Sequence, residues 1–166
     1  MTPQEYKQFC ESTYACPPGT DREEYLRLLL IEEMGEVASL FAKAMRDGSL
    51  HFFDEGKFGE YKRIYGPEAV NRAALLKELG DVMWCAAMIH TDDDGWLDEH
   101  VSLVMDTGRI SQVAHMHWSH CPSVFRVVQR LCLDLGFTPE EVATANVEKL
   151  RGRGERGTIH GAGDER

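Results

Sequence analysis

Two pairs of acidic residues lie on helical rows that are otherwise apolar. In residues 20–46, apolar side chains recur at the i, i+4, i+7 spacing of a core-facing helix; Glu33 falls inside that stripe and Glu36 on the neighbouring row. In residues 68–90, Glu78 falls inside the apolar row and Asp81 lies beside it. The apolar rows comprise Leu26, Leu30, Val37, Phe41 and Ala44, then Leu75, Val82, Cys85 and Ile89. The sequence therefore predicts four carboxylates at the seam between two packed helices.

Carboxylates in such a seam must be protonated, be paired with a base or bind a metal, because desolvating each charge costs several kcal/mol. No Lys or Arg lies on these rows; Lys77 is turned about 100° from Glu78 around the helix. An oxygen-only set of ligands suits Mg²⁺, with Mn²⁺ as a substitute. Solvated helix faces would explain either pair alone, but two pairs on apolar rows favour a metal. The chain lacks the Glu-x-x-His motif of di-iron carboxylate bundles.

The elements that position these acids are expected to be helices. Capping patterns begin at Thr2, Thr20 and Thr138, and the helical periodicity predicts six helices, close to residues 2–15, 20–46, 68–90, 96–118, 122–135 and 138–150. No strand-like alternation of any length occurs. We therefore expect an all-α compact bundle, with one domain over residues 1–150. The last sixteen residues, 151–166, contain five glycines and are expected to be a flexible charged tail.

The composition and the absence of certain motifs argue against several classes of function. The 166 residues include 18 Lys and Arg against 28 Asp and Glu, so the formal net charge of −10 argues against a nucleic-acid partner. No window is apolar enough to span a membrane, and the start lacks the order of a signal peptide, which argues against a membrane partner. The five cysteines are odd in number and widely spaced, which predicts free thiols and a cytoplasmic location. The G-x-x-x-x-G-K-[ST] motif of P-loop ATPases is absent.

Three segments resemble one family. They are Glu32-Glu33-x-x-Glu36, Glu78-Leu79-Gly80-Asp81, and a late segment that joins Leu135 to Val142 with Asn146-x-x-Lys149-Leu150-x-x-Arg153. Together, and in this order, they resemble the MazG-like all-α nucleoside triphosphate pyrophosphohydrolases. Relatives in that superfamily include dimeric dUTPases and phosphoribosyl-ATP pyrophosphatases.

The resemblance implies a fold, a reaction and a set of roles. The fold would be a helical bundle of this type carrying two insertions, and the chain would assemble as a homodimer or homotetramer. Mg²⁺ would promote hydrolysis of a nucleoside triphosphate to the monophosphate and pyrophosphate, in nucleotide-pool control. By position, the metal ligands would be Glu33, Glu36, Glu78 and Asp81; Glu32 would act with Glu33 in catalysis by orienting water; and Asn146, Lys149 and Arg153 would contact phosphates. Without the resemblance, those last three residues would be a basic helix end that complements the helix dipole.

Two departures from the family pattern bear on the substrate. The stretch between the acidic motifs is long, and residues 91–121 resemble an insertion before the closing helix. Residues 49–67 carry aromatic side chains that could stack on a nucleobase or form a satellite core, so the base-binding residues stay open. We favour a deoxynucleoside triphosphate, with a purine such as dGTP or GTP suggested by that stretch. The alternatives are a phosphoribosyl-ATP pyrophosphatase and a non-catalytic helical interaction module with a relic metal site.

Overall fold

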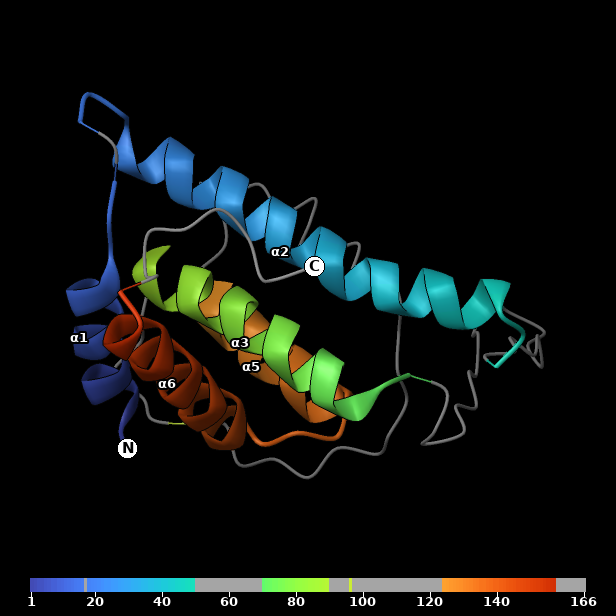
Figure 1. Cartoon of the computed structure of the whole chain (residues 1–166). Helices are drawn as coiled ribbons and strands as arrows, with labels where there is room; N and C mark the ends of the chain where they lie inside the picture. Colours follow the sequence, from blue (N-terminus) through green and yellow to red (C-terminus); the bar gives the residue numbers. More distant parts are fainter. Residues whose placement is uncertain (17, 50–69, 90–95, 97–123, 158–166) are drawn as a thin grey trace.

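The protein is described by a computed structural model over residues 1–16, 18–49, 70–89, 96 and 124–157. These residues form five helices and no strand, which confirms the all-α prediction for the described part of the chain (Figure 1). The helices are α1 (Pro3–Thr13), α2 (Arg22–Arg46), α3 (Arg72–Ile89), α5 (Val124–Asp134) and α6 (Pro139–Glu155). The predicted helix over 96–118 lies outside the described residues apart from Trp96, and so does the aromatic stretch apart from Ser49.

Helix α3 is the centre of the bundle. It packs against each of the other four described helices, whereas α2 packs against α3 alone among them. Figure 1 shows α2 along one flank of α3 and α6 along the other. Ten α3 residues are buried, and the core that they join includes the predicted apolar stripe of α2. One helix therefore presents side chains to two different neighbours, α2 and α6.

Helix α2 has the predicted extent but not the predicted cap. The N-cap is Asp21, whose side chain accepts a hydrogen bond from the backbone N–H of Glu24, so the expected capping box at Thr20 is wrong by one residue. A carboxylate at this position also complements the positive end of the helix dipole. The helix ends at Arg46, and Gly48 then takes a positive φ of 74°, in agreement with the predicted stop.

The other helix boundaries differ by a few residues. Helix α3 begins at Arg72, later than the expected start near Glu68, and Asn71 Oδ1 accepts a hydrogen bond from Ala74 N at its first turn. Helix α6 is capped by Thr138 as predicted, but it runs to Glu155 instead of ending at Leu150. Residues 151–155 of the expected tail are therefore helical. A glycine inside a helix costs only about 1 kcal/mol, so the glycines there do not end α6.

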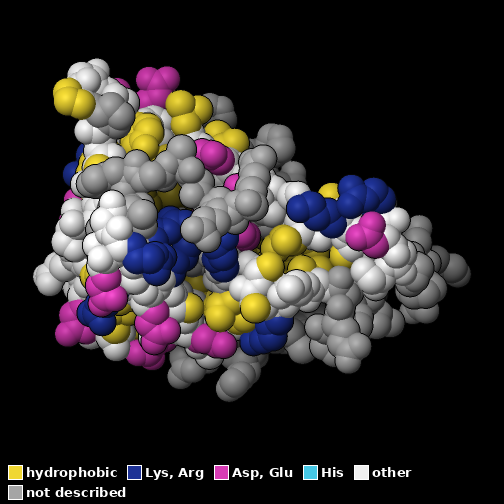
Figure 2. Space-filling model, in the orientation of Figure 1, with side chains coloured by type: hydrophobic (Ala, Val, Ile, Leu, Met, Phe, Trp, Pro, Cys, Tyr) yellow, Lys and Arg dark blue, Asp and Glu magenta, His cyan; other side chains and the backbone are white. Residues whose placement is uncertain are grey.

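The surface charge is mixed on the face that Figure 2 shows. Lys and Arg side chains gather near the middle of this face, with Asp and Glu side chains spread around them. The acidic net charge of the chain therefore does not form one continuous patch there. No helix in the described ranges is long and apolar enough to cross a membrane.

Candidate metal centre

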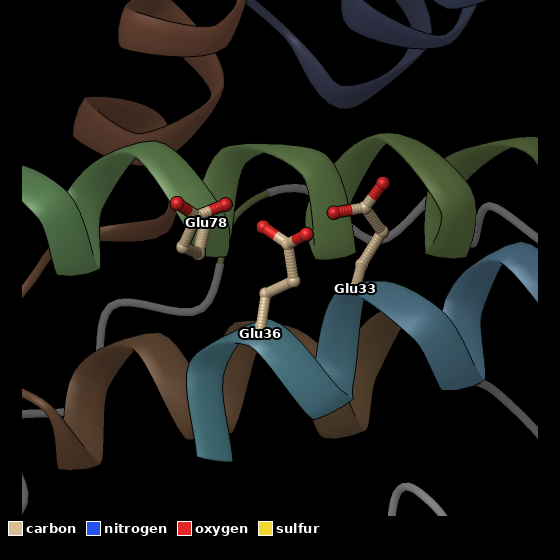
Figure 3. Close-up of side chains that lie close together, drawn as sticks. All are labelled: Glu33, Glu36 and Glu78. Atoms are coloured by element: carbon tan, nitrogen blue, oxygen red, sulfur yellow. The ribbon is translucent and has the colours of Figure 1, made fainter. Parts of the chain in front are cut away.

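Three of the four predicted carboxylates converge between α2 and α3. Glu33 and Glu36 extend from α2 towards α3, and Glu78 lies opposite them on α3 (Figure 3). Each residue offers one carboxylate oxygen, and these three oxygens lie within 4.8 Å of one another. We call Glu33, Glu36 and Glu78 the three-glutamate cluster. Glu33 and Glu78 lie on the packed faces of their helices, as the helical period predicts, whereas Glu36 is exposed.

Glu78 is the most buried member of the cluster. Its residue is 9% exposed, and its Oε2 atom is buried without a hydrogen-bond partner among the described residues. Lys77 Nζ lies 3.7 Å from the other oxygen, but the Lys77 side chain is 38% exposed, so solvent weakens that ion pair. Burial raises the pKa of the Glu78 carboxyl; the Lys77 charge opposes this rise, and Glu36 adds to it. The cluster therefore lacks a buried cation of its own at this position.

Glu33 has the most perturbed carboxyl group of the cluster. Its pKa is raised to about 8, first by burial and then by the negative charges of Asp81 and Glu36. A carboxyl group with this pKa retains its proton near neutral pH unless a cation replaces it. An oxygen-only set of ligands with a buried, unpartnered oxygen fits a hard divalent cation such as Mg²⁺. Glu33, Glu36 and Glu78 are therefore the described residues that could hold such an ion.

Asp81, the fourth predicted ligand, has partners within the chain. Its Oδ2 forms an ion pair with Lys149 Nζ, and its Oδ1 accepts a hydrogen bond from Asn146 Nδ2 at 3.2 Å. Asp81 is not one of the three residues whose oxygens meet, although its charge still acts on Glu33. The sequence predicts no Lys or Arg at the acidic seam, but Lys149 pairs with Asp81 there. Lys149 comes from α6, so it is absent from the α2 and α3 rows on which that expectation rested.

Asn146 is buried between α3 and α1 residues. It is 2% exposed, and its Oδ1 accepts a hydrogen bond from the hydroxyl of the fully buried Tyr6 at 3.0 Å. Both ends of the amide are thus engaged with the protein, and Asn146 supports Asp81 in this structure instead of presenting a bare amide to phosphate. We call Tyr6, Asn146, Asp81 and Lys149 the Asp81 chain. Sequence reasoning missed Tyr6, whose only signal was the i, i+4 apolar spacing with Cys10 in α1.

Gly80 explains how α6 approaches α3 so closely. A Cβ atom built on Gly80 would lie 3.1 Å from Asn146 Cβ and 3.2 Å from Asn146 Nδ2, which is tighter than ordinary contact. The missing side chain therefore allows the amide of Asn146 to reach Asp81, the next residue along α3. This glycine belongs to the Glu78-Leu79-Gly80-Asp81 motif, so its small size has a local structural reason.

The remaining predicted site residues lie outside the three-glutamate cluster and the Asp81 chain. Glu32 is exposed on α2, next to Glu33 in sequence, and its charge contributes to the raised pKa of Glu33. Arg153 lies in the last turn of α6, seven positions after Asn146. The aromatic stretch considered for base binding lies outside the described residues. Comparisons of this chain with models of protein families, with curated proteins and with solved structures give no match.

Proposed function

We propose that this chain is a Mg²⁺-dependent pyrophosphohydrolase that converts a (deoxy)nucleoside triphosphate to the monophosphate and pyrophosphate. The observation that carries the proposal is the three-glutamate cluster, whose carboxylate oxygens from α2 and α3 lie within 4.8 Å of one another. The family resemblance supplies the reaction and a role in nucleotide-pool control. It also supplies the homo-oligomeric assembly, while the free thiols of the described cysteines accord with a cytoplasmic location.

The metal would be held by Glu33, Glu36 and Glu78, with Asp81 beside them. When bound, the ion supplies positive charge to the triphosphate and lowers the pKa of a coordinated water. The cluster explains why such charge is needed, because three carboxylates at these distances would repel a polyanionic substrate. Without an added cation, the acidic seam is unsuited to a nucleotide.

Glu32 and Glu33 can also position the attacking water. Glu32 is exposed beside Glu33, so its carboxylate can accept a hydrogen bond from water and orient it. As the water oxygen forms its bond to phosphorus, the Glu32 carboxylate can take up the proton that the water loses, while Glu33 beside it would hold the metal. The phosphoanhydride bond between the α and β phosphates then breaks, and pyrophosphate leaves.

Positive side chains of α6 would bind the phosphates. Lys149 and Arg153 lie one turn apart on α6, and Lys149 Nζ already sits beside Asp81 at the edge of the acidic seam. Fixed cations stabilise the charge that spreads over phosphate oxygens during the transfer. We assign Asn146 a supporting part, because its amide holds Asp81 and is itself held by Tyr6.

A pyrophosphate-release assay tests the proposal. Purified protein would be incubated with Mg²⁺ and a panel that includes each deoxynucleoside triphosphate, GTP and phosphoribosyl-ATP, and the products identified by ³¹P NMR. We expect monophosphate and pyrophosphate from at least one nucleotide, with dGTP among the better substrates, and none when EDTA is present. Release from phosphoribosyl-ATP alone would favour the alternative that the chain is a phosphoribosyl-ATP pyrophosphatase. No release from any substrate, with Mn²⁺ also tried, would refute the enzyme and leave a helical interaction module.

A further inference from the structure

The two oxygens of Asp81 have partners of different kinds. Oδ1 accepts a hydrogen bond from the Asn146 amide at 3.2 Å, and Oδ2 is paired with the Lys149 ammonium. Both partners come from α6, yet one is a short side chain and the other has a flexible stem of four carbons. A divalent cation that approached Oδ2 would be repelled by the Lys149 ammonium, whereas the Asn146 amide on Oδ1 carries no net charge.

The Asn146 side of this arrangement is fixed. Asn146 is 2% exposed and lies against Gly80, where even a Cβ atom would be crowded. The Tyr6 hydroxyl donates to Asn146 Oδ1, which leaves the donor Nδ2 facing Asp81. Rotating or withdrawing this amide would break the buried hydrogen bond with Tyr6 and the partly buried one with Asp81, and a buried polar group left without a partner costs about 1–3 kcal/mol.

The Lys149 side can change. The side chains of Lys149 and Asp81 are 15% and 19% exposed, so solvent reaches this pair while it does not reach the Tyr6 side chain. A lysine can swing its ammonium away by rotating its stem, with no backbone movement. Asp81 is also close enough to the three-glutamate cluster for its charge to act on Glu33. The Lys149 charge therefore occupies part of the region that a divalent cation would enter.

We propose that Lys149 is an internal counter-ion that a divalent cation displaces from Asp81, and that Tyr6 is a positioning residue that keeps Asp81 ready through Asn146. The inference rests on the proposed metal centre and adds to it an order of events, in which the cation binds and Lys149 then becomes available to the nucleotide. The two ends of the Asp81 chain thus have opposite effects on cation affinity. Lys149 competes with the cation, and Tyr6 assists it.

The competing end is tested with Mn²⁺ alone, titrated into metal-free protein and followed by the EPR signal of free Mn²⁺. Lys149→Met should tighten Mn²⁺ binding about tenfold, a factor typical of coupling between two sites. Lys77→Met is the matched control, because Lys77 also pairs with an acid of the seam but is more exposed. Loss of an exposed pair should change the affinity at most about threefold.

The assisting end is tested by Tyr6→Phe, which keeps the ring and removes the hydroxyl. Mn²⁺ affinity should fall about three- to tenfold, the worth of one hydrogen bond. Tyr14→Phe is the control, because Tyr14 follows α1, packs its ring on Trp84 and takes no part in the Asp81 chain. Far-UV circular dichroism on all four variants verifies that the helices are retained.

The outcomes separate the two proposals. Tighter binding by Lys149→Met than by Lys77→Met, with weaker binding by Tyr6→Phe than by Tyr14→Phe, is the expected result. If wild-type protein binds Mn²⁺ but Lys149→Met matches Lys77→Met, or Tyr6→Phe matches Tyr14→Phe, the displacement scheme is overturned while the metal centre stands. If wild-type protein binds no Mn²⁺, the metal centre itself fails, and both proposals fail with it.

Discussion

Helix α3 carries two carboxylates one turn apart, the buried Glu78 and the partly exposed Asp81, and their surroundings are opposite. Glu78 faces α2, where it meets two further glutamates, and its ion-pair partner is its partly exposed neighbour on α3, Lys77. Asp81 faces α6, where a lysine and a buried amide engage both of its oxygens. The α2–α3 seam therefore has surplus negative charge, whereas Asp81 is compensated within the chain.

This difference shows that burial alone does not identify a metal ligand. Two acids of one helix can differ in whether the fold supplies their counter-charge, and here the more buried Glu78 has the weaker ion pair. In the three-glutamate cluster, burial and the neighbouring acids raise the pKa values of Glu33 and Glu78, so these carboxyl groups favour either a proton or an added cation. The Asp81 chain has the positive charge built in, so a cation there must compete with Lys149.

The largest expected effect comes from removing a ligand of the cluster. Glu36→Ala should lower turnover by about three orders of magnitude, because the metal contributes several kcal/mol to the transition state. Asp81→Ala should abolish turnover in the same way. Glu148→Gln, at an exposed position of α6, is the control and should be near wild type. Steady-state pyrophosphate release measures all three, and unchanged turnover in Glu36→Ala would remove that residue from the set of ligands.

The next effect is the pH dependence of cation binding. The pKa of Glu33 is about 8 in the metal-free protein, so below that pH a proton must leave before the carboxylate can bind the ion. Mn²⁺ affinity should therefore rise with pH roughly tenfold per unit up to about 8 and level off above it. Calorimetric titration at several pH values measures this slope, and an affinity independent of pH between 6 and 8 would contradict it.

The raised pKa of Glu33 also predicts how the stability of the metal-free protein depends on pH. Because the folded-state pKa of Glu33 lies above its ordinary value of 4.5, the folded protein binds more protons than the unfolded chain between these pH values. This carboxyl group therefore contributes stability at low pH that is lost as the pH rises towards 8. Glu33→Gln should flatten that part of the stability curve in urea unfolding.

Neutralising Glu78 and neutralising Asp81 should have opposite effects on the stability of the protein. In metal-free protein, Glu78→Gln should raise the free energy of unfolding by roughly 1 kcal/mol, because it relieves repulsion within the cluster. Asp81→Asn should lower it by about 2 kcal/mol, because it leaves the Lys149 ammonium without its carboxylate. Urea unfolding of the two variants measures both changes. If both variants changed the free energy of unfolding in the same direction, the surroundings of Glu78 and Asp81 would not differ as we describe.

The smallest effects come from two helical glycines. Gly80→Ala should lower the free energy of unfolding by about 1–2 kcal/mol, because the new methyl group would crowd Asn146. Gly35→Ala is the matched control, since a Cβ there meets nothing within 4 Å, and it should stabilise α2 by roughly 0.5–1 kcal/mol. Thermal unfolding compares them, and a stabilising Gly80→Ala would show that α6 does not need this close approach to α3.

Local periodicity was enough to predict the α2–α3 seam. Glu33 and Glu78 stand inside apolar rows, so the helical period turns them towards whichever helix packs there, without knowledge of the rest of the fold. The cap of α2 shows the limit of local patterns, because Thr20 and Asp21 are both good caps and only the backbone geometry selects Asp21.

The Asp81 chain could not be predicted in the same way. Tyr6, Asn146 and Lys149 are 75, 65 and 68 positions from Asp81 in the sequence, so no helical spacing relates them. Their meeting depends on how α1 and α6 pack on α3, and that packing depends on the room left by Gly80. The sequence resemblance placed Lys149 near phosphates, but the ion pair with Asp81 is a consequence of tertiary structure.

Our main proposal is that the three-glutamate cluster binds a divalent cation for nucleotide hydrolysis. Its most direct test is a crystal structure with Mn²⁺ and a non-hydrolysable deoxynucleoside triphosphate, using anomalous scattering to locate the metal. We predict an anomalous peak coordinated by oxygens of Glu33, Glu36 and Glu78, with the triphosphate bound to the same ion. A nucleotide complex without a peak at this cluster, or with the metal held elsewhere in the chain, would contradict the account.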